Sequence, residues 1–345
     1  MTGGLHFGDR YLLLDRLDCS QGPETWRATD ELLDRGAAVK IFWPEWCGTD
    51  AMIPRVQARL PRVMGLAHRG IASTYDHGEA RVMVDHDTWV PEWSQDGVPV
   101  MYVVTELVAG LSLADMLARR GRLAAEETLE LSAQAARALH AAHQRGVIHE
   151  NVRPGNVLVT AQGQVKVTDF AAPSRTAHYL APELARGQDP SPRSDVYALG
   201  VVVYQCLTGH PPFESDNCVL VATAHLNQEP PSLPATIDPD IVAVVAVAME
   251  KDPEYRFQSA EAFAKALEKL LARDPSALDD IPPKPANRCS GRHDAPPANP
   301  MMSPPGSTVR GAPDVTSATD QAAPPRQRAL LRRRLRTWLA RQFWS

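Results

Sequence analysis

The stretch His149-Glu150-Asn151-Val152-Arg153-Pro154-Gly155-Asn156 is the part of the sequence around which the rest can be ordered. Before it, apolar residues recur at helical spacing over residues 125–145, which predicts a long helix that the next glycine ends. After it, residues 157–168 contain two short apolar runs around a glycine and predict a hairpin. The hairpin leads directly into Asp169-Phe170-Ala171. Helix, polar loop, hairpin and aspartate-bearing triplet therefore form one continuous unit.

The first third of the chain predicts strands. Tyr11–Leu17 and Glu24–Asp30 have the pattern of two strands joined by a turn, and Met101–Thr105 predicts a buried strand. Ala37–Phe42 predicts a short apolar strand that contains one lysine, Lys40. A lysine inside an apolar strand either meets an anion or extends to water. For this segment taken alone, extension to water is the more common outcome.

The turn between the first two strands does not have the composition of a phosphate-binding loop. Such a loop needs several glycines, because backbone N–H groups must approach the phosphates closely. The segment from Asp18 to Pro23 contains only Gly22, and Pro23 has no N–H group to donate. An ordinary hairpin turn is therefore favoured here.

Two further segments of this region are irregular. Residues 44–66 predict a poor helix that is broken by Pro54 and Pro61 and that carries arginines but no acid after Asp50. Residues 85–99 are polar, contain two tryptophans and predict a surface insertion.

Helical patterns dominate after the strands. One short helix is marked by apolar residues over Leu113–Leu117, and three more follow the hairpin, over Asp195–Leu207, Ile241–Met249 and Ser259–Leu271. Strands thus come first and helices afterwards. This order predicts an α+β chain of two lobes with a cleft between them.

The charge distribution separates a body from a tail. Residues 1–275 carry 25 Lys/Arg against 36 Asp/Glu, whereas residues 276–345 carry 11 against 5. An acidic body argues against nucleic-acid binding as the main activity. The five cysteines are scattered without a CxxC pair, which suits a reducing cytoplasm and neither a disulfide framework nor a zinc site. We expect a cytoplasmic protein, because no apolar run reaches the ~18 residues of a membrane-spanning helix and the first ten residues lack a signal core.

The tail itself divides into two predicted segments. Residues 276–325 are rich in Pro, Ala, Ser and Gly and predict a disordered linker, because they cannot bury enough apolar area to offset the entropy of ordering. Residues 326–345 contain seven arginines and no acid, and at helical spacing leucines and Trp338 gather on the face opposite the arginines. The pattern is equally compatible with a disordered basic tail and with a basic amphipathic helix for an anionic membrane surface or a partner groove.

Together these residues resemble the eukaryotic-like Ser/Thr protein kinases of bacteria over residues 8–272. The resemblance rests on separate motifs in the family's order: Ala38-Val39-Lys40, Glu106–Val108, His149–Asn156, Asp169-Phe170-Ala171, Thr176–Glu183, Asp195–Gly200, Leu207–Phe213 and Lys251–Phe257. It implies a bilobal protein-kinase-like fold with a β-rich N-lobe over residues 8–108 and a larger helical C-lobe over residues 109–272. In the family, the arginine of the last motif, here Arg256, pairs with a glutamate, here Glu183.

The resemblance also implies an ATP site. The implied binding residues are Lys40 for the α- and β-phosphates, Ala38 and Leu158 around adenine, the backbone of Glu106 and Val108 at the hinge, and Asn156 and Asp169. Asn156 and Asp169 are also the implied ligands of Mg²⁺ or Mn²⁺. Purely structural roles remain open for the same residues: Lys40 can reach water or pair with Asp169, and Asn156 can cap the loop.

Several positions depart from the family pattern. Asn151 stands at the position of the catalytic aspartate, and Arg153 at that of the lysine that contacts the γ-phosphate. Glu150 replaces the arginine that receives an activation-loop phosphate. The helix glutamate that should pair with Lys40 is missing, and its place falls at or near Arg59. The glycines of the phosphate loop are absent, and the activation loop is short.

Two functions are compatible with these departures. An asparagine can accept a hydrogen bond but cannot take a proton, and positioned bases contribute roughly 10²–10⁴-fold to the rate. The main prediction is a catalytically impaired Ser/Thr pseudokinase that retains residues for ATP and acts as a signalling scaffold or allosteric partner of another protein. The alternative is a weakly active Ser/Thr protein kinase that transfers the ATP γ-phosphate to a protein hydroxyl with a non-standard catalytic loop. Asn151→Asp alone is expected not to restore strong activity, because Arg59, Pro23 and the short loop remain.

Overall fold

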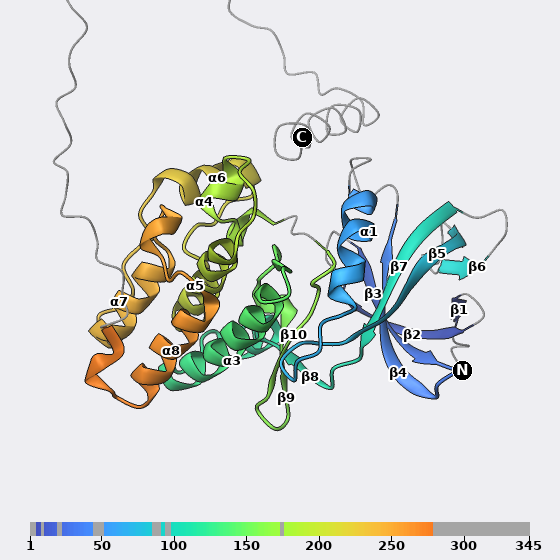
Figure 1. Ribbon diagram of the computed structural model, residues 1–345, viewed down its shortest axis with the longest axis horizontal. Coiled ribbons are helices and arrows are strands. Elements are labelled where there is room, and N and C mark those ends of the chain that lie inside the picture. The colour runs from blue at the N-terminus through green and yellow to red at the C-terminus, as the bar shows by residue number, and fades with distance from the viewer. Residues whose placement is uncertain are drawn as a thin grey trace, which may run out of the picture.

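The protein has two lobes, a sheet-rich N-lobe and a helical C-lobe, drawn at the right and left of Figure 1. This computed structural model describes residues 5–7, 10–18, 23–43, 52–84, 91–93, 98–172 and 176–278. The predicted two-lobed α+β fold is confirmed. The predicted tail over residues 326–345 lies outside the described residues, as does the predicted linker apart from residues 276–278. Those three residues belong to a short turn, η4 (Pro275–Leu278), in which Ala277 is buried.

The N-lobe sheet contains seven strands within the described residues, in the order β1-β2-β3-β4-β7-β5-β6. Their bounds are β1 (Leu5–Phe7), β2 (Tyr11–Asp18), β3 (Glu24–Asp30), β4 (Arg35–Phe42), β5 (Thr74–Val84), β6 (Pro91–Trp93) and β7 (Val98–Glu106). Neighbouring strands run antiparallel throughout. Parts of the segment predicted as a surface insertion belong to this sheet, because β6 pairs with β5 and β7 already begins at Val98.

Helix α1 (Met52–Val63) is continuous, so the prediction of a helix broken by two prolines is wrong. Pro54 lies in the first turn, where the backbone N–H has no acceptor within the helix, and its loss therefore costs little. Pro61 lies in the last turn and removes only one hydrogen bond of the helix. Val56 and Leu60, four residues apart, are buried and hold α1 against the sheet and the C-lobe.

The two faces of the N-lobe sheet have different partners. Val39 and Ile41 of β4 belong to an apolar cluster formed by the N-lobe alone, whereas Phe42 belongs to the large core that includes α1 and the C-lobe. Side chains alternate along a strand. Ala38 and Lys40 therefore lie on the face of Phe42, which is the face turned to the other lobe.

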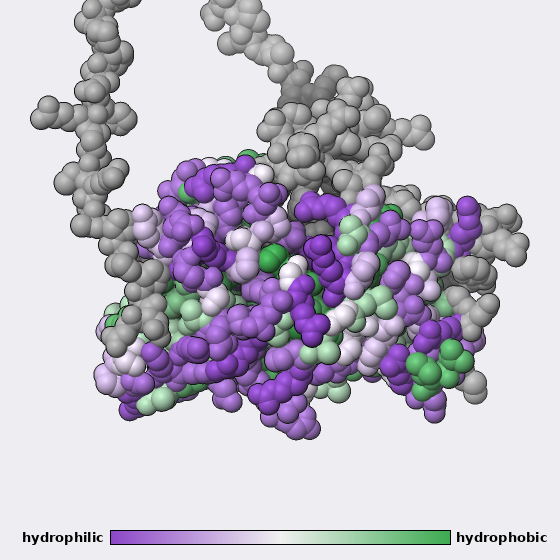
Figure 2. Space-filling model, in the orientation of Figure 1, coloured by the Kyte–Doolittle hydropathy of each residue, from purple (hydrophilic) through white to green (hydrophobic). Residues whose placement is uncertain are grey.

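The C-lobe is built around α5 (Pro192–Thr208), most of whose residues are buried. Around it lie α2 (Leu113–Arg120), α3 (Ala125–His143), α4 (Pro182–Ala185), α6 (Cys218–Asn227), α7 (Pro239–Ala248) and α8 (Ala260–Leu271). Gly200 allows α5 and α7 to approach closely, because a Cβ atom there would lie 2.9 Å from the Cβ of Ala248. The helices predicted at α2, α3, α5, α7 and α8 are confirmed, and α4 and α6 are additional. Figure 2 shows a largely hydrophilic surface over this lobe.

A small three-stranded sheet connects the lobes to the polar loop. It consists of β8 (Gly110–Ser112), β9 (Val157–Thr160) and β10 (Val165–Val167), in the order β10-β9-β8. A Cβ atom on Gly110 would lie 2.3 Å from the carbonyl oxygen of Val159, so this approach of β8 to β9 requires glycine. Within the described part of the chain, no helix is long and apolar enough to cross a membrane.

His225 on α6 is fully buried and is held in one neutral form. Its Nε2 donates to the carbonyl oxygen of His178 at 2.9 Å, and its Nδ1 accepts from the hydroxyl of Tyr197 at 2.8 Å. Burial lowers the pKa of His225 from 6.5 to about 4, and the charge of Lys251 acts in the same direction.

This lowered pKa predicts a loss of stability in mild acid. Between the two pKa values the unfolded chain binds the proton more readily than the folded chain. The contribution of His225 to the free energy of unfolding should therefore be present above pH 6.5 and be lost as the pH falls to about 4, by at most about 3 kcal/mol. Urea unfolding of the wild type and of His225→Gln over this pH range is the measurement. A wild type that loses no more stability than the variant would contradict the expectation.

Candidate active site

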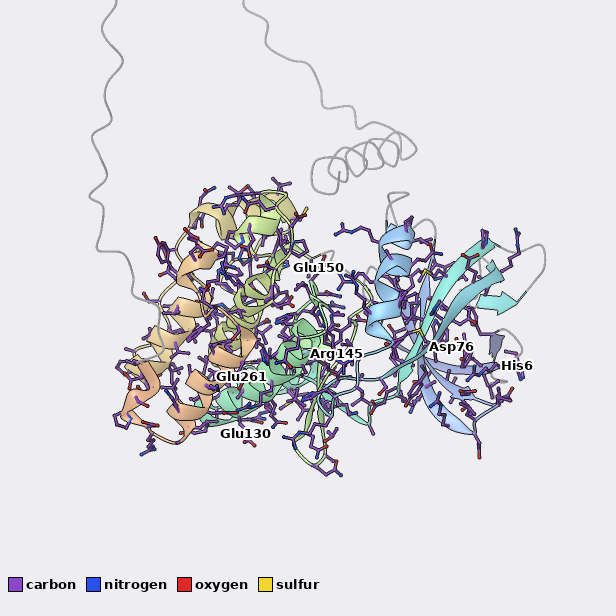
Figure 3. All side chains as sticks on the ribbon, in the orientation of Figure 1. His6, Asp76, Glu130, Arg145, Glu150 and Glu261 are labelled. Carbon is purple, nitrogen blue, oxygen red and sulfur yellow. The ribbon has the colours of Figure 1, made fainter. Side chains whose placement is uncertain are left out.

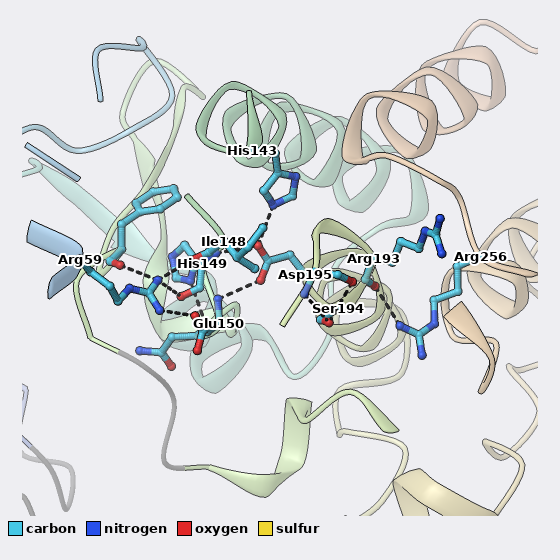
Figure 4. A network of polar contacts seen from close by, with 12 residues as sticks. Arg59, His143, Ile148, His149, Glu150, Arg193, Ser194, Asp195 and Arg256 are labelled. Atoms are coloured by element: carbon cyan, nitrogen blue, oxygen red, sulfur yellow. Dashed lines mark hydrogen bonds and ion pairs between the residues drawn. The ribbon is translucent and has the colours of Figure 1, made fainter. Parts of the chain in front are cut away.

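The polar loop, His149–Asn156, is held in place by the buried carboxylate of Asp195 on α5. Asp195 accepts hydrogen bonds from the backbone N–H groups of His149 at 2.7 Å and Glu150 at 2.9 Å, and it contacts Nε2 of His143 at 2.7 Å. Burial alone would raise the pKa of Asp195, but the hydrogen bond and charge of His143 outweigh burial, and the pKa is lowered. This role was not predicted, although an acid within the apolar run of α5 was the available signal. The hydrogen bonds are drawn in Figure 4.

His149 joins the loop to the hairpin that follows it. Its Nε2 donates to the carbonyl oxygen of Thr168 at 2.7 Å, and its Nδ1 accepts from the backbone N–H of Asn151 at 3.1 Å. The ring also meets the ring of Phe170 edge to face, with centroids 4.4 Å apart. Burial lowers the pKa of His149 and favours the neutral ring. His149 is therefore an architectural residue of the loop.

Asn156 and the segment before Asp169 lie side by side because of the hairpin register. Val157 of β9 pairs with Val167 of β10, and the N–H of Thr168 donates to the carbonyl oxygen of Asn156 at 2.9 Å. The side-chain amide of Asn156 donates to the carbonyl oxygen of Asn151 at 2.7 Å. The amide nitrogen of Asn156 thus stabilises the loop, as the predicted capping role requires. The amide oxygen is the atom that Asn156 can offer to a cation.

Lys40 and Asp169 form an ion pair across the two lobes. The ammonium lies 2.5 Å from the carboxylate, and the two side chains are 12% and 19% exposed. Burial disfavours the charged carboxylate, but Lys40, and after it Arg153 and His149, outweigh burial and lower the pKa of Asp169. Lys40 therefore meets an anion instead of extending to water. Of the two structural roles left open for Lys40, pairing with Asp169 is the one that the structure shows.

The two predicted catalytic positions lie beside this ion pair. Asn151 is buried, and its side-chain amide donates to the carbonyl oxygen of Ala172 at 3.0 Å. The positive charge of Arg153 helps to lower the pKa of Asp169 and opposes the raised pKa of Tyr179, the last residue of the short turn η2 (Ala177–Tyr179). Both positions are thus close to the end of the hairpin, where the predicted metal ligands lie.

The predicted adenine positions lie where the lobes connect. Ala38 on β4 pairs with Thr105 on β7, and β7 ends one residue later at Glu106. Leu158 lies on β9 in the small sheet of the C-lobe. The carboxylate of Glu106 is engaged by Lys166 at 2.7 Å, and its N–H donates to the carbonyl oxygen of Ser73 at 2.8 Å, which leaves its carbonyl oxygen for the predicted backbone contact. Val108 follows β7 in the connector.

Arg59 and Glu150, two positions that depart from the family pattern, contact each other. Arg59 projects from α1 onto the polar loop and forms an ion pair with the Glu150 carboxylate. Figure 3 places Glu150 between the C-lobe and α1. Sequence reasoning identified both departures separately but did not predict the contact.

The activation segment, which follows Asp169, ends at Glu183, and a buried ion pair fixes this end to the C-lobe. Arg256 donates to both carboxylate oxygens of Glu183, at 2.8 and 2.7 Å, which confirms the predicted pair. Upstream, the hydroxyl of Thr176 lies 3.1 Å from Nδ1 of His178. Residues 173–175 lie outside the described residues.

The residues fit a magnesium–nucleotide site better than a free metal site. No cluster of three or more His, Cys, Asp or Glu side chains that could hold a metal occurs among the described residues. Magnesium commonly takes one or two protein oxygens and completes its shell with phosphates and water. The carboxylate of Asp169 and the amide oxygen of Asn156 match that donor set, and Lys40 supplies a cation next to it.

Comparison with known proteins shows which proteins the chain resembles. Residues 92–275 match the family model described as protein kinase domain. The chain is 36% identical over 340 residues to the serine/threonine-protein kinase PknA of Mycobacterium tuberculosis, with 94% of this chain and 73% of that protein covered. It is 34% identical over 274 residues to the serine/threonine-protein kinase drp72 of Corynebacterium efficiens, with 75% and 49% covered. The solved PknI kinase domain of M. tuberculosis superimposes with a TM-score of 0.65 at 28% identity, over 79% of this chain and 99% of that one.

Proposed function

The chain belongs to the protein kinase family, and within it to the Ser/Thr protein kinases of bacteria, and from this premise we propose that it transfers the γ-phosphate of ATP to a protein hydroxyl. This is the second of the two functions compatible with the sequence. The comparisons favour it, because two relatives that cover 94% and 75% of this chain are named as Ser/Thr kinases. The pseudokinase prediction has no support from them.

The observation that carries the proposal is the grouping of Lys40, Asp169 and Asn156 at the junction of the lobes. Lys40 provides the cation for the phosphates, and Asp169 and Asn156 provide two oxygens for the metal. A bound magnesium ion supplies positive charge to the phosphates as they react. The Lys40–Asp169 pair holds both groups in one place before a nucleotide arrives.

The remaining catalytic residues act by positioning. The side-chain oxygen of Asn151 can accept a hydrogen bond from the substrate hydroxyl and so orient it, but it cannot take the proton, which passes to an oxygen of the transferred phosphoryl group as ADP leaves. Arg153 presents a planar fork of donors, which suits the oxygens of a phosphoryl group. Phosphoryl transfer depends mostly on positioning and electrostatics. We therefore expect a slow but genuine kinase.

A phosphotransfer assay tests the proposal. The full chain is incubated with radiolabelled ATP, Mg²⁺ or Mn²⁺ and a basic acceptor protein, and label on serine and threonine is measured. Asp169→Ala removes a metal ligand and should lower the signal to background. A wild type that transfers no more label than Asp169→Ala with either metal would overturn the proposal and leave the scaffold function as the better one.

Asn151→Asp provides a second, finer prediction. We expect the rate to rise by less than about tenfold, although positioned bases contribute roughly 10²–10⁴-fold. The reason is local: the Asn151 amide donates to the Ala172 carbonyl oxygen, and a carboxylate has no proton to donate there. Initial rates of the two chains give the measurement, with exposed Asn227→Asp as a control for added charge. A gain of about 100-fold would show that the base alone was missing.

A further inference from the structure

Arg59 connects α1 to three backbone groups of the active site. Its guanidinium donates to the carbonyl oxygens of Ile148, directly before the polar loop, and of His149, at 3.1 Å, in the loop (from here on the catalytic loop, His149–Asn156). It also donates to the carbonyl oxygen of Phe170 at 2.9 Å, directly after the metal-ligand position Asp169. A single side chain of the N-lobe thus contacts both segments that carry the predicted catalytic groups (Figure 4).

Glu150 supplies the negative charge that faces the guanidinium of Arg59. Its carboxylate is 14% exposed, forms an ion pair with Arg59, and lies 3.4 Å from Arg55, one turn earlier on α1. Burial raises the pKa of Glu150, and the charges of Arg59 and Arg55 oppose that shift. The residue has a φ of 60°, and its backbone N–H is held by Asp195. The carboxylate is therefore aimed at α1 by a fixed backbone.

The two residues are complementary replacements. The resemblance places a glutamate on this helix and an arginine in the loop, and this chain has the opposite charges at both positions. A glutamate at position 59 alone would face Glu150, and an arginine at position 150 alone would face Arg59 and Arg55. Each replacement is electrostatically acceptable only in the presence of the other.

We propose that Arg59 and Glu150 form a positioning pair that fixes α1 and the catalytic loop in their working arrangement without a phosphate on the activation loop. The proposal rests on the kinase function proposed above. In the family, the arginine at position 150 would be occupied by the phosphate of a modified loop residue. Here that position carries a buried carboxylate whose partner is built into α1. The ion pair of Arg59 with Glu150 therefore links the N-lobe to the C-lobe without a bound phosphate.

Arginine is required for this role because of its shape. The planar fork of Arg59 reaches Glu150 and the carbonyl oxygens of the loop and of Phe170 at once. A lysine has one nitrogen and cannot meet acceptors in such different directions. Arg59→Lys should therefore keep the charge but lose most of the positioning.

A charge-reversal cycle tests the pair. Arg59→Glu and Glu150→Arg should each lower kcat. The reciprocal double variant restores the ion pair but not the donors to the three carbonyl oxygens, so it should recover only part of kcat, with a coupling of about tenfold between the two sites. Mg–ATP should stabilise all three variants as it does the wild type, because the groups implied to bind nucleotide are unchanged. Arg62→Glu makes the same charge change on an exposed position of α1 and should leave kcat unaltered.

Three outcomes would overturn the proposal. One is a double variant no faster than the slower single variant. Another is a pair of single variants that unfold more readily yet keep the wild-type kcat, because the contact would then be structural only. The third is a wild type whose rate falls on treatment with a protein phosphatase, because the pair is proposed to act without a loop phosphate.

Failure of the kinase proposal itself is distinguishable from failure of the pair. If the wild type transfers no phosphate, the same four chains are compared by urea unfolding and by amide hydrogen exchange in the loop. Faster exchange at the catalytic-loop amides in each single variant, and partial recovery of protection in the double variant, would still support the pair. If the amide exchange rates of the loop were unchanged by the charge reversals, the proposed Arg59–Glu150 pair would be overturned whether or not the protein is a kinase.

Discussion

Replacing Arg256 by methionine is expected to lower the free energy of unfolding by about 3–5 kcal/mol, the range found when one partner of a buried ion pair is removed. Arg256 is fully buried and donates to both oxygens of Glu183. Its other donors reach the carbonyl oxygens of Glu250, Arg193 and Lys251. Methionine fills a similar volume but leaves these acceptors, including one charge, without a partner.

The carboxylate is the main source of the expected loss. Ser194 also donates to Glu183, at 2.7 Å, but one neutral hydrogen bond does not neutralise a buried charge. The double variant Arg256→Met/Glu183→Met should therefore be more stable than Arg256→Met alone, because it removes the stranded carboxylate with its partner. Urea unfolding of the three chains gives the comparison. A loss below about 1 kcal/mol in Arg256→Met would show that water reaches the site, since exposed pairs contribute only that much.

The fold could be predicted because its signals are local and occur in order. Alternating apolar residues and glycines located β2, β3, β4, β7 and the β9–β10 hairpin, and helical spacing located α3, α5, α7 and α8. The failure at α1 has a physical reason. A proline is costly only where it removes a hydrogen bond inside the helix, and the positions of Pro54 and Pro61 near the two ends of α1 remove at most one. The sequence alone does not show where α1 begins and ends, so the cost of Pro54 and Pro61 could be judged only from the structure.

The site could be predicted residue by residue, and the resemblance also predicted the Arg256–Glu183 pair, but the contact of Arg59 with Glu150 could not be predicted. Motif positions located Lys40, Asp169 and Glu150, yet the partners lie 129 residues apart for Lys40 with Asp169 and 91 apart for Arg59 with Glu150. A pairing over that distance depends on how α1 sits against the C-lobe, which no local pattern encodes. Two apparent defects, a reversed charge on α1 and a reversed charge in the loop, therefore become one compensated contact only in the folded chain.

Lys40→Met is expected to remove nucleotide binding and catalysis together. In the wild type, Mg–ATP at 100 times its dissociation constant should add about 2.7 kcal/mol to the free energy of unfolding. The variant loses the cation implied to meet the α- and β-phosphates, so this gain should largely disappear. Its phosphotransfer rate should fall about 10²–10³-fold, the effect of removing one preorganised electrostatic group. Thermal unfolding with and without Mg–ATP, and the radiolabel assay, measure the two effects.

The same change also has a consequence without nucleotide, and this makes the prediction specific. Asp169 would lose its nearest cation and keep the charge of Arg153, so its pKa should rise towards the value that burial favours. We expect the unliganded variant to be less stable by about 1.5–3 kcal/mol, as for a lost hydrogen bond between charged groups. Lys265→Met, at an exposed site on α8, controls for the loss of a lysine and should keep both stability and the gain with Mg–ATP. If Lys40→Met were destabilised but still gained the full 2.7 kcal/mol with Mg–ATP, the Lys40–Asp169 pair would be a structural link between the lobes, and the phosphates would have to be held elsewhere.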